Sequence, residues 1–310
     1  MPANLSRDRF EAAHRFVLEN GRPLDGALLD FSLGQGTAEA VMVALIAFQN
    51  PDGGFGHGLE PDMRSPASTA IATSIGLRHL VRVGAPAKHP TVVGIIDWLD
   101  GALDRENGVW PIVGQDVGLA PHAPWWTWSE DLAANWNGFH FNPTAEILAH
   151  LYQWRAAAPA GLFECAEVGL RRALAETSLL EGAYDLKCAI RLAVSDELPA
   201  NLAKPLEALV RRSIAAHDPA DDHASPFDAA PMPDSPFAHL VDGRLEGALT
   251  ALIDSQSEDG GWTWNPEWAW GFVDKKAWAA AHADWRGQLT RENLETLLAY
   301  GRVEAPPLAK

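Results

Sequence analysis

Apolar residues recur every three to four positions along most of this chain, which is the spacing of amphipathic helices. In residues 5–19, Phe10, Ala13 and Phe16 fall on one helical face before Asn20 and Gly21 interrupt the pattern. The same spacing predicts further helices over residues 37–49, 66–83, 90–104, 142–154, 160–176, 183–194, 198–216, 241–255, 275–285 and 290–300.

No segment shows the alternation of apolar and polar residues that a strand requires. Residues 22–34 read as a connector, and two longer stretches, 107–141 and 217–237, read as loops. The first of these loops is rich in tryptophan and the second in proline and aspartate. The pattern therefore predicts an all-α protein, and the short connections favour helical hairpins stacked side by side.

One turn occurs twice, about two hundred residues apart. Gln49 is followed by Asp52-Gly53-Gly54-Phe55, and Gln256 is followed by Asp259-Gly260-Gly261-Trp262. Glycine adopts the positive φ that lets a helix stop and reverse, and aspartate accepts backbone hydrogen bonds in such a turn. A degraded third copy spans residues 104–110. We interpret these copies as an internal repeat.

This motif resembles the QW-type repeat of the terpenoid cyclase and protein prenyltransferase superfamily. The resemblance is specific at residues 49–55 and 256–262 and loose elsewhere. It implies an α/α toroid of five to six helical hairpins, with residues 1–310 forming a single domain. In that superfamily the motif is structural, so the resemblance implies architecture more directly than activity.

Charge and composition restrict the possible partners. The formal net charge of −17 makes nucleic acid and anionic membranes poor partners. We find neither a signal peptide nor a run of about 20 apolar residues that could span a bilayer. Cys165 and Cys188 lie in apolar helical patterns, as expected of reduced cysteines in a cytoplasmic protein.

Glu60-Pro61-Asp62, preceded by His57, is the sharpest candidate for catalysis. Two carboxylates held by a proline form an acid site if burial raises the pKa of one of them. The alternative is structural: Asp62 caps a turn and pairs with Arg64, while Glu60 is solvated.

The superfamily resemblance also bears on chemistry. Cyclases that protonate an alkene carry Asp-x-Asp-Asp directly before a small hydroxyl residue. In this chain Glu60-x-Asp62 ends several residues before Ser68-Thr69, and the third acid is absent. The chain has no Asp-Asp-x-x-Asp motif for magnesium, and neither cysteine suits the zinc site of the prenyltransferases. We therefore expect no metal and no cofactor.

Thirteen tryptophans stand against three tyrosines, and many of them fall outside helical spacing. Indoles offer flat apolar surfaces to an isoprenoid or to the face of a sugar ring. If the turns and the aromatic loop reach one rim, the expected ligand contacts are Phe55, Arg64, Trp125, Trp126, Trp128, Trp136, His140, Asn142, Glu146, Trp262, Trp264 and Trp268.

Three functions remain open from the sequence. The first is a cyclase-like or prenyltransferase-like enzyme for an isoprenoid or another hydrophobic small molecule. The second is a carbohydrate-active hydrolase or lyase with paired carboxylates. The third is a binding protein without catalysis. A cavity lined by aromatic residues would favour the first, and an open polar groove with carboxyl groups would favour the second.

Overall fold

The computed structural model describes residues 3–130, 139–180, 182–217, 225–263 and 274–304. These residues form 12 α-helices and no strand, which confirms the all-α prediction. The helices are α1 (Arg7–Asn20), α2 (Pro23–Ser32), α3 (Ala38–Ile46), α4 (Ala70–Arg82), α5 (Pro90–Ala102), α7 (Phe141–Leu151), α8 (Ala160–Glu176), α9 (Ala183–Ala193), α10 (Ala200–Ala216), α11 (Pro226–Ala229), α12 (Asp242–Asp254) and α13 (Lys275–Ala299).

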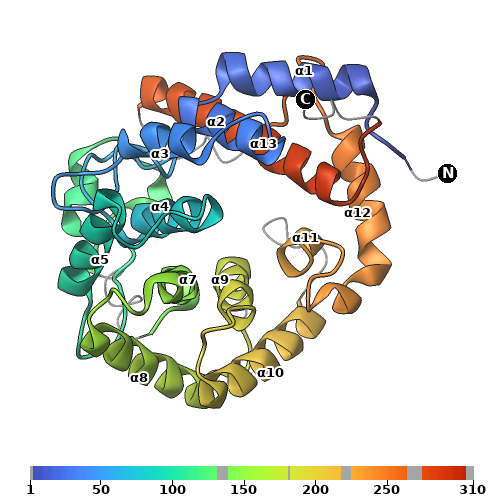
Figure 1. Ribbon diagram of the computed structural model, residues 1–310. Coiled ribbons are helices and arrows are strands. Elements are labelled where there is room, and N and C mark those ends of the chain that lie inside the picture. Colours follow the sequence, from blue (N-terminus) through green and yellow to red (C-terminus); the bar gives the residue numbers. More distant parts are fainter. Residues whose placement is uncertain (1–2, 131–138, 181, 218–224, 264–273, 305–310) are drawn as a thin grey trace.

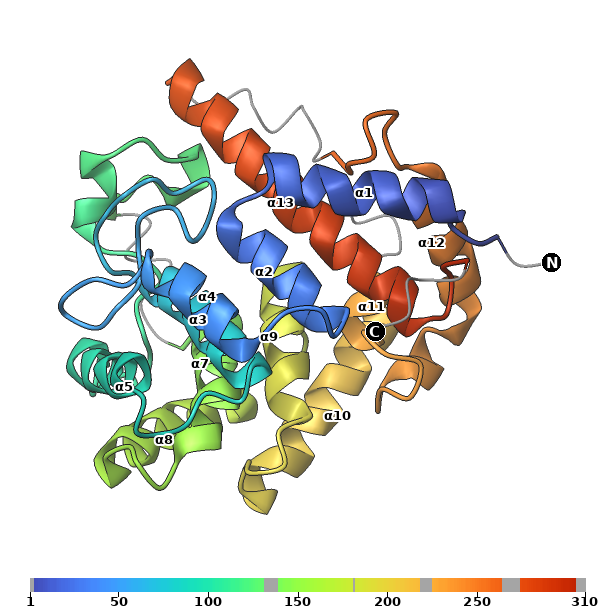
Figure 2. The ribbon, with the colours of Figure 1, turned by 45° about the horizontal axis from the view of Figure 1, so that its top comes forward.

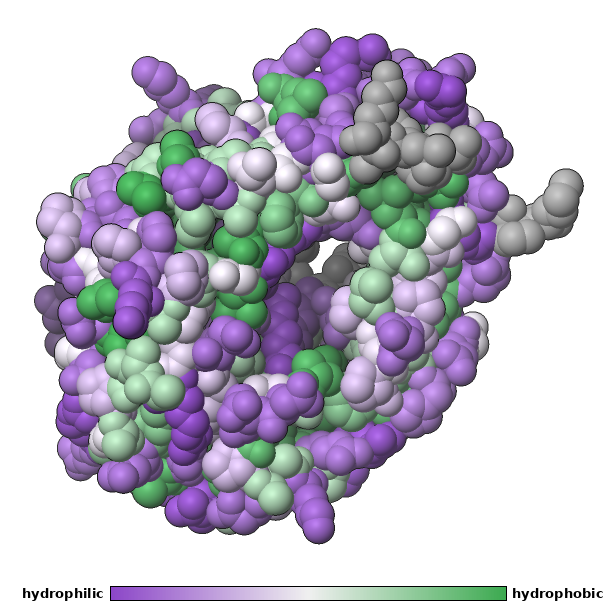
Figure 3. Space-filling model, in the orientation of Figure 1, coloured by the Kyte–Doolittle hydropathy of each residue, from purple (hydrophilic) through white to green (hydrophobic). Residues whose placement is uncertain are grey.

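Successive helices alternate between the periphery and the centre of the molecule. Figure 1 shows α5, α8, α10 and α12 on the outside, and α4, α7, α9 and α11 facing the middle. Helix α7 packs against both α4 and α9, while α13 packs against α1 and α2. Figure 3 shows a central hollow in the same view, with hydrophilic residues on part of its wall and hydrophobic residues on other parts.

The two ends of the chain meet. In Figure 2, α1 and α2 lie against the long helix α13. The amide of Leu5 donates to the carbonyl of Arg302 at 2.8 Å, and the amide of Glu304 donates to the carbonyl of Leu5 at 2.9 Å. Backbone hydrogen bonds thus join the first described segment to the last.

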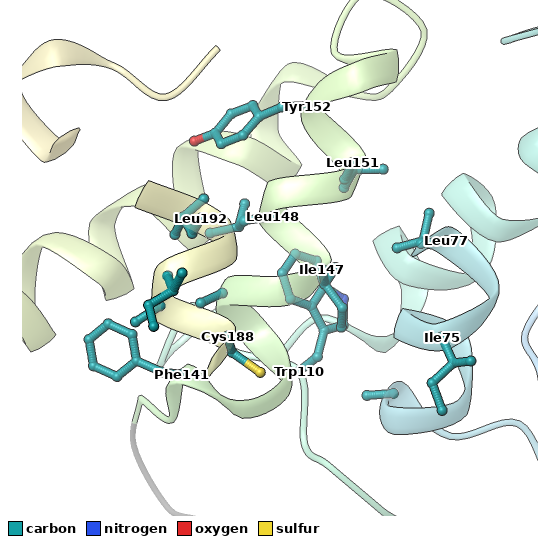
Figure 4. Close-up of a cluster of buried hydrophobic side chains, with 14 of the residues drawn as sticks. Ile75, Leu77, Trp110, Phe141, Ile147, Leu148, Leu151, Tyr152, Cys188 and Leu192 are labelled. Atoms are coloured by element: carbon teal, nitrogen blue, oxygen red, sulfur yellow. The ribbon is translucent and has the colours of Figure 1, made fainter. Parts of the chain in front are cut away.

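The apolar faces of the helices form a core between the inner and outer helices. Figure 4 shows Ile147 and Leu148 of α7 near Leu77 of α4 and Leu192 of α9. These side chains are buried, as is Trp110 from the loop that precedes α7. Burying side chains of this size stabilises the fold by about 1.5–3 kcal/mol each.

The two glycine turns have the same hydrogen bonds. The Gln49 side-chain amide donates to the carbonyl of Gly53 at 3.0 Å, and that of Gln256 donates to the carbonyl of Gly260 at 2.7 Å. Asp52 accepts from the amide of Gly54 at 3.0 Å, as Asp259 accepts from Gly261 at 3.1 Å. The repeat in the sequence is therefore a repeat in structure.

A buried threonine on an inner helix anchors the aromatic residue of each copy. The amide of Phe55 donates to Thr73 Oγ1 at 3.1 Å, and that of Trp262 donates to Thr290 Oγ1 at 2.9 Å. The amide of Trp110 donates to Thr144 Oγ1 at 3.2 Å, so the segment 104–110 makes the same contact.

The glycine with positive φ in each turn lies against the outer helix of a neighbouring pair. A Cβ on Gly53 would lie 2.1 Å from the carbonyl oxygen of Gly94 in α5, and one on Gly108 would lie 2.4 Å from that of Cys165 in α8. A Cβ on Gly260 would lie 2.7 Å from the carbonyl of Ala12 in α1. No side chain fits at these joints, which explains the glycines physically.

The predictions of helices and loops fail at three places, since α11 (Pro226–Ala229) lies within the predicted loop 217–237. Residues 22–34 contain α2 and are not a connector: Pro23 occupies the first helical position, where proline is favoured, and Leu24 and Leu28 are buried. The predicted helices 275–285 and 290–300 are one helix, α13. Its Gly287 allows the backbone of Gly21 to approach, because a Cβ there would lie 2.5 Å from Gly21 Cα.

Candidate functional site

The acid segment is held by the first part of the aromatic loop. The amide of Ala123 donates to the carbonyl of Asp62 at 2.8 Å, and the amide of Arg64 donates to the carbonyl of Pro121 at 2.9 Å. This short antiparallel pairing places the side chain of Asp62 beside the single-turn helix η2 (Pro124–Trp126).

Two indoles bind the carboxylate of Asp62. Trp126 Nε1 donates to Oδ1 at 2.7 Å, and Trp125 Nε1 donates to Oδ2 at 3.1 Å. Asp62 is buried, and burial raises its pKa to about 6 although the indoles and Trp285 favour the charged form. The structure thus brings together three residues that the sequence analysis assigned to one site.

Glu60 lies among charged groups from three inner elements. Burial, and then the charge of Asp62, raise the pKa of Glu60 well above its usual range, while Arg78 and Arg22 act in the opposite direction. Its side chain keeps some access to solvent. Burial and the neighbouring Asp62 therefore favour the protonated form of Glu60, next to a carboxyl group that two indoles hold in place.

Glu146 on α7 is the centre of an ionic cluster. Arg78 Nη1 from α4 lies 3.2 Å from Oε1, and Arg191 Nη1 from α9 lies 2.5 Å from Oε2. Burial would raise the pKa of Glu146, but the two guanidinium groups hold it well below its usual range. Glu146 is thus a buried carboxylate, and it also contributes to the electrostatic environment of Glu60.

Asn142 reaches the same cluster through a thiol. Cys188 Sγ lies 3.7 Å from Asn142 Oδ1 and 3.6 Å from Glu146 Oε2. Burial raises the pKa of Cys188 well above its usual range, so it is an uncharged thiol. The Asn142 amide donates to Asp185 Oδ1 at 2.7 Å, before a cis peptide bond to Pro143.

A second buried network connects the start of α2 to α13. Arg22 Nε donates to Asp25 Oδ2 at 2.8 Å, and Arg22 Nη2 donates to Gln288 Oε1 at 2.8 Å. Arg291 Nε donates to the other oxygen of Asp25 at 3.4 Å and is itself 2% exposed. Because every member is buried and paired, this network stabilises the packing of α2 on α13.

Two residues expected beside the acid pair bind elsewhere. The exposed ring of His57 lies 2.8 Å from Asn50 Oδ1 through Nε2 and belongs to the glycine turn. Arg64 pairs with Asp284 at 2.6 Å, not with Asp62 as the structural alternative proposed. His57 is held by a contact within its own turn, whereas Arg64 is held by a residue 220 positions away, which a pattern of residue types does not reveal.

Phe55 and Trp262 are core residues, so their assignment to ligand contact is wrong. Phe55 is 0% exposed and packs against Gly76, and Trp262 is 3% exposed with its Nε1 donating to the carbonyl of Leu252 at 2.8 Å. In both copies of the turn, the aromatic residue packs into the core beside the inner-helix threonine that accepts from its backbone amide.

The remaining predicted contacts are spread out. Trp128 is half-buried against the main core, and His140 lies near Asp185. Trp136, Trp264 and Trp268 lie outside the described residues. The sequence analysis missed Arg22, Arg78 and Arg191. For Arg78 and Arg191 the signal was an arginine within the apolar pattern of a helix, whereas Arg22 precedes α2 and had no such signal.

Comparisons with protein-family models, with curated proteins and with solved structures give no match to this chain. In the part of the chain that the structure describes, no helix has both the length and the apolar character needed to cross a bilayer. The same residues contain no group of three histidine, cysteine or acidic side chains placed to hold a metal ion.

Proposed function

We propose that the helices form an α/α toroid and that its central hollow is the active site of an enzyme. The substrate is a small, polar, hydroxylated molecule of the carbohydrate type. Glu60 acts as the general acid in cleavage of a C–O bond, by hydrolysis or elimination.

The repeated joints support the toroid. The turn after α3 rests on α5, the turn after α5 rests on α8, and the turn after α12 rests on α1. A series of helical pairs in which the last contacts the first is a closed arrangement, and it matches the architecture implied by the resemblance of the glycine turns.

The state of Glu60 carries the functional proposal. A carboxyl group that remains protonated near neutral pH can give its proton to a leaving oxygen. Asp62 does not need to touch the substrate: its charge, fixed by Trp125 and Trp126, helps to keep the proton on Glu60. In this mechanism Glu60 is the catalytic residue and Asp62 is a positioning residue.

The surroundings favour a polar substrate over an isoprenoid. Arg78, Arg191 and Glu146 project from the inner helices, and Figure 3 shows hydrophilic residues on part of the wall of the hollow. Trp125 is 40% exposed beside the acid pair, so one part of its indole is available to stack on a sugar ring. An isoprenoid would leave these charges without solvent, which is costly.

A substrate screen tests the proposal. The full-length protein is assayed with aryl glycosides of neutral and acidic sugars, and in parallel with prenyl alcohols and prenyl diphosphates. We expect turnover of a glycoside, and a loss of about 100-fold or more in Glu60→Gln, as removal of a general acid predicts. Glu106→Gln, at an exposed carboxyl outside the site, is the control and should retain full activity.

Two results would contradict the proposal. Turnover of isoprenoids alone would reject the polar substrate. Undiminished glycoside turnover in Glu60→Gln, with the fold confirmed by circular dichroism, would reject Glu60 as the acid.

A further inference from the structure

The charges around Glu146 do not balance. Its carboxylate faces two guanidinium groups, those of Arg78 and Arg191. His150 lies 3.6 Å from Oε1, but burial lowers its pKa, so it adds no positive charge near neutral pH. One unit of positive charge therefore remains in a protein whose formal net charge is −17.

The other nearby acids leave this charge in place. Burial and the charge of Asp62 raise the pKa of Glu60, which favours its uncharged form. Asp228, which also acts on Arg191, pairs with Lys187 at 3.5 Å. The unbalanced charge is therefore centred on the two arginines.

Most N–H donors of these arginines are unused. Within the described part of the chain, the hydrogen bond of each guanidinium goes to Glu146 alone, through one Nη1. A guanidinium carries five N–H donors in a planar fork that suits carboxylates and phosphates. The side chains of Arg78 and Arg191 are 26% and 36% exposed, so solvent reaches the remaining donors.

Glu146 gives the two arginines a fixed geometry. It is 5% exposed, and each of its oxygens holds one guanidinium, so both side chains are oriented before a ligand arrives. A preorganised pair loses less entropy on binding than two free surface arginines would. The pair also lies close enough to Glu60 for Arg78 to influence its pKa.

We propose that Arg78 and Arg191 form a subsite for a carboxylate group on the substrate, beside the acid Glu60. A single residual charge matches a monoanion such as a carboxylate better than a doubly charged phosphate, and the neighbouring acids disfavour the phosphate further. This inference rests on the proposed function and narrows the substrate to an acidic sugar or a similar hydroxylated carboxylic acid.

Equilibrium binding tests the subsite without any need for turnover. Glucuronate, galacturonate, glucose, galactose and glucose 6-phosphate are titrated into the full-length protein at constant ionic strength, by calorimetry and by thermal shift. The two uronates should bind at least about tenfold more tightly than their neutral counterparts, as expected for a hydrogen-bonded charge pair. Glucose 6-phosphate should bind more weakly than the uronates.

Variants separate a binding site from an ion pair that only stabilises the fold. Arg191→Gln should weaken uronate binding about tenfold or more without affecting neutral sugars, and Arg191→Lys should recover part of it. Arg155→Gln, at a partly exposed ion pair with Glu167, is the control.

The outcomes distinguish this inference from the proposed function. If the uronates show no advantage over neutral sugars in the native protein, or if Arg191→Gln leaves that advantage intact, the subsite is rejected. Tightest binding of the phosphate would reject the carboxylate assignment. Uronate binding without any turnover would reject the proposed enzymatic function and leave the carboxylate subsite in place. Turnover of neutral glycosides alone would reject the carboxylate subsite and leave the enzymatic function in place.

Discussion

Replacement of Gly53 by alanine tests whether the glycine turns are the joints between successive helical pairs. Gly53 has φ of +94°, and a Cβ there would lie 2.1 Å from the carbonyl oxygen of Gly94 in α5. A left-handed backbone costs a non-glycine residue about 1–2 kcal/mol. Forcing a methyl group into a packed contact costs about 1–3 kcal/mol more.

The sum predicts a loss of about 2–5 kcal/mol in the free energy of unfolding, a large part of the about 5–15 kcal/mol typical of a domain. Gly84 is the matched control: its φ is +65°, and no atom lies within 4 Å of the position of its Cβ. Gly84→Ala should lose only the backbone contribution, about 1–2 kcal/mol.

Urea unfolding followed by circular dichroism measures both variants. Gly260→Ala, whose Cβ would lie 2.7 Å from the carbonyl of Ala12, should behave like Gly53→Ala. Equal losses in Gly53→Ala and Gly84→Ala would refute the reasoning, because the contact with α5 would then contribute nothing.

Three further predictions concern buried polar groups. Because the pKa of Asp62 is raised from 3.8 to about 6 in the folded state, the native protein holds this proton more tightly than the unfolded chain. The free energy of unfolding should therefore fall by up to about 3 kcal/mol from pH 4 to pH 6, relative to that of Asp62→Asn. Urea titrations across that range measure the fall. An identical pH profile in the two proteins would contradict this prediction. Thr290→Val leaves the buried amide of Trp262 without its acceptor and should lower the free energy of unfolding by about 1–3 kcal/mol. The control is Thr296→Val, because the Thr296 hydroxyl donates to the carbonyl of Glu292 within the same helix. This control should lose clearly less. Arg291→Met leaves the buried Asp25 with one partner in place of two and should lower the free energy of unfolding by about 3–5 kcal/mol. Arg7→Met, at an exposed ion pair, should lower it by less than about 1 kcal/mol. Similar losses at the two sites would contradict the assignment of a buried network.

The sequence predicted most helices and the glycine turns because both are local signals. The residues of each turn lie within seven positions of one another, so their hydrogen bonds can be inferred from spacing alone. Helix α2 was missed because residues 22–34 were interpreted as a connector, although the proline at position 23 suits a first helical position.

Less of the candidate site could be predicted, because its contacts join distant parts of the chain. Arg191 meets Glu146 across 45 positions, and Arg22 meets Gln288 across 266. The pairing of Asp62 with Trp125 and Trp126 was anticipated only as a shared location, not as hydrogen bonds. The burial of Phe55 and Trp262 follows from packing against inner helices, which no local pattern specifies.

The contact between Gly260 and Ala12 has a consequence for biosynthesis. Helix α1 leaves the ribosome well before the turn that covers its backbone, which is translated roughly two hundred and forty residues later. At common elongation rates this is a delay of about 12–50 seconds, during which Phe16 and its apolar neighbours have no partner from the last hairpin. The nascent chain should therefore expose the apolar face of α1 to chaperones until the turn at Gly260 has been translated.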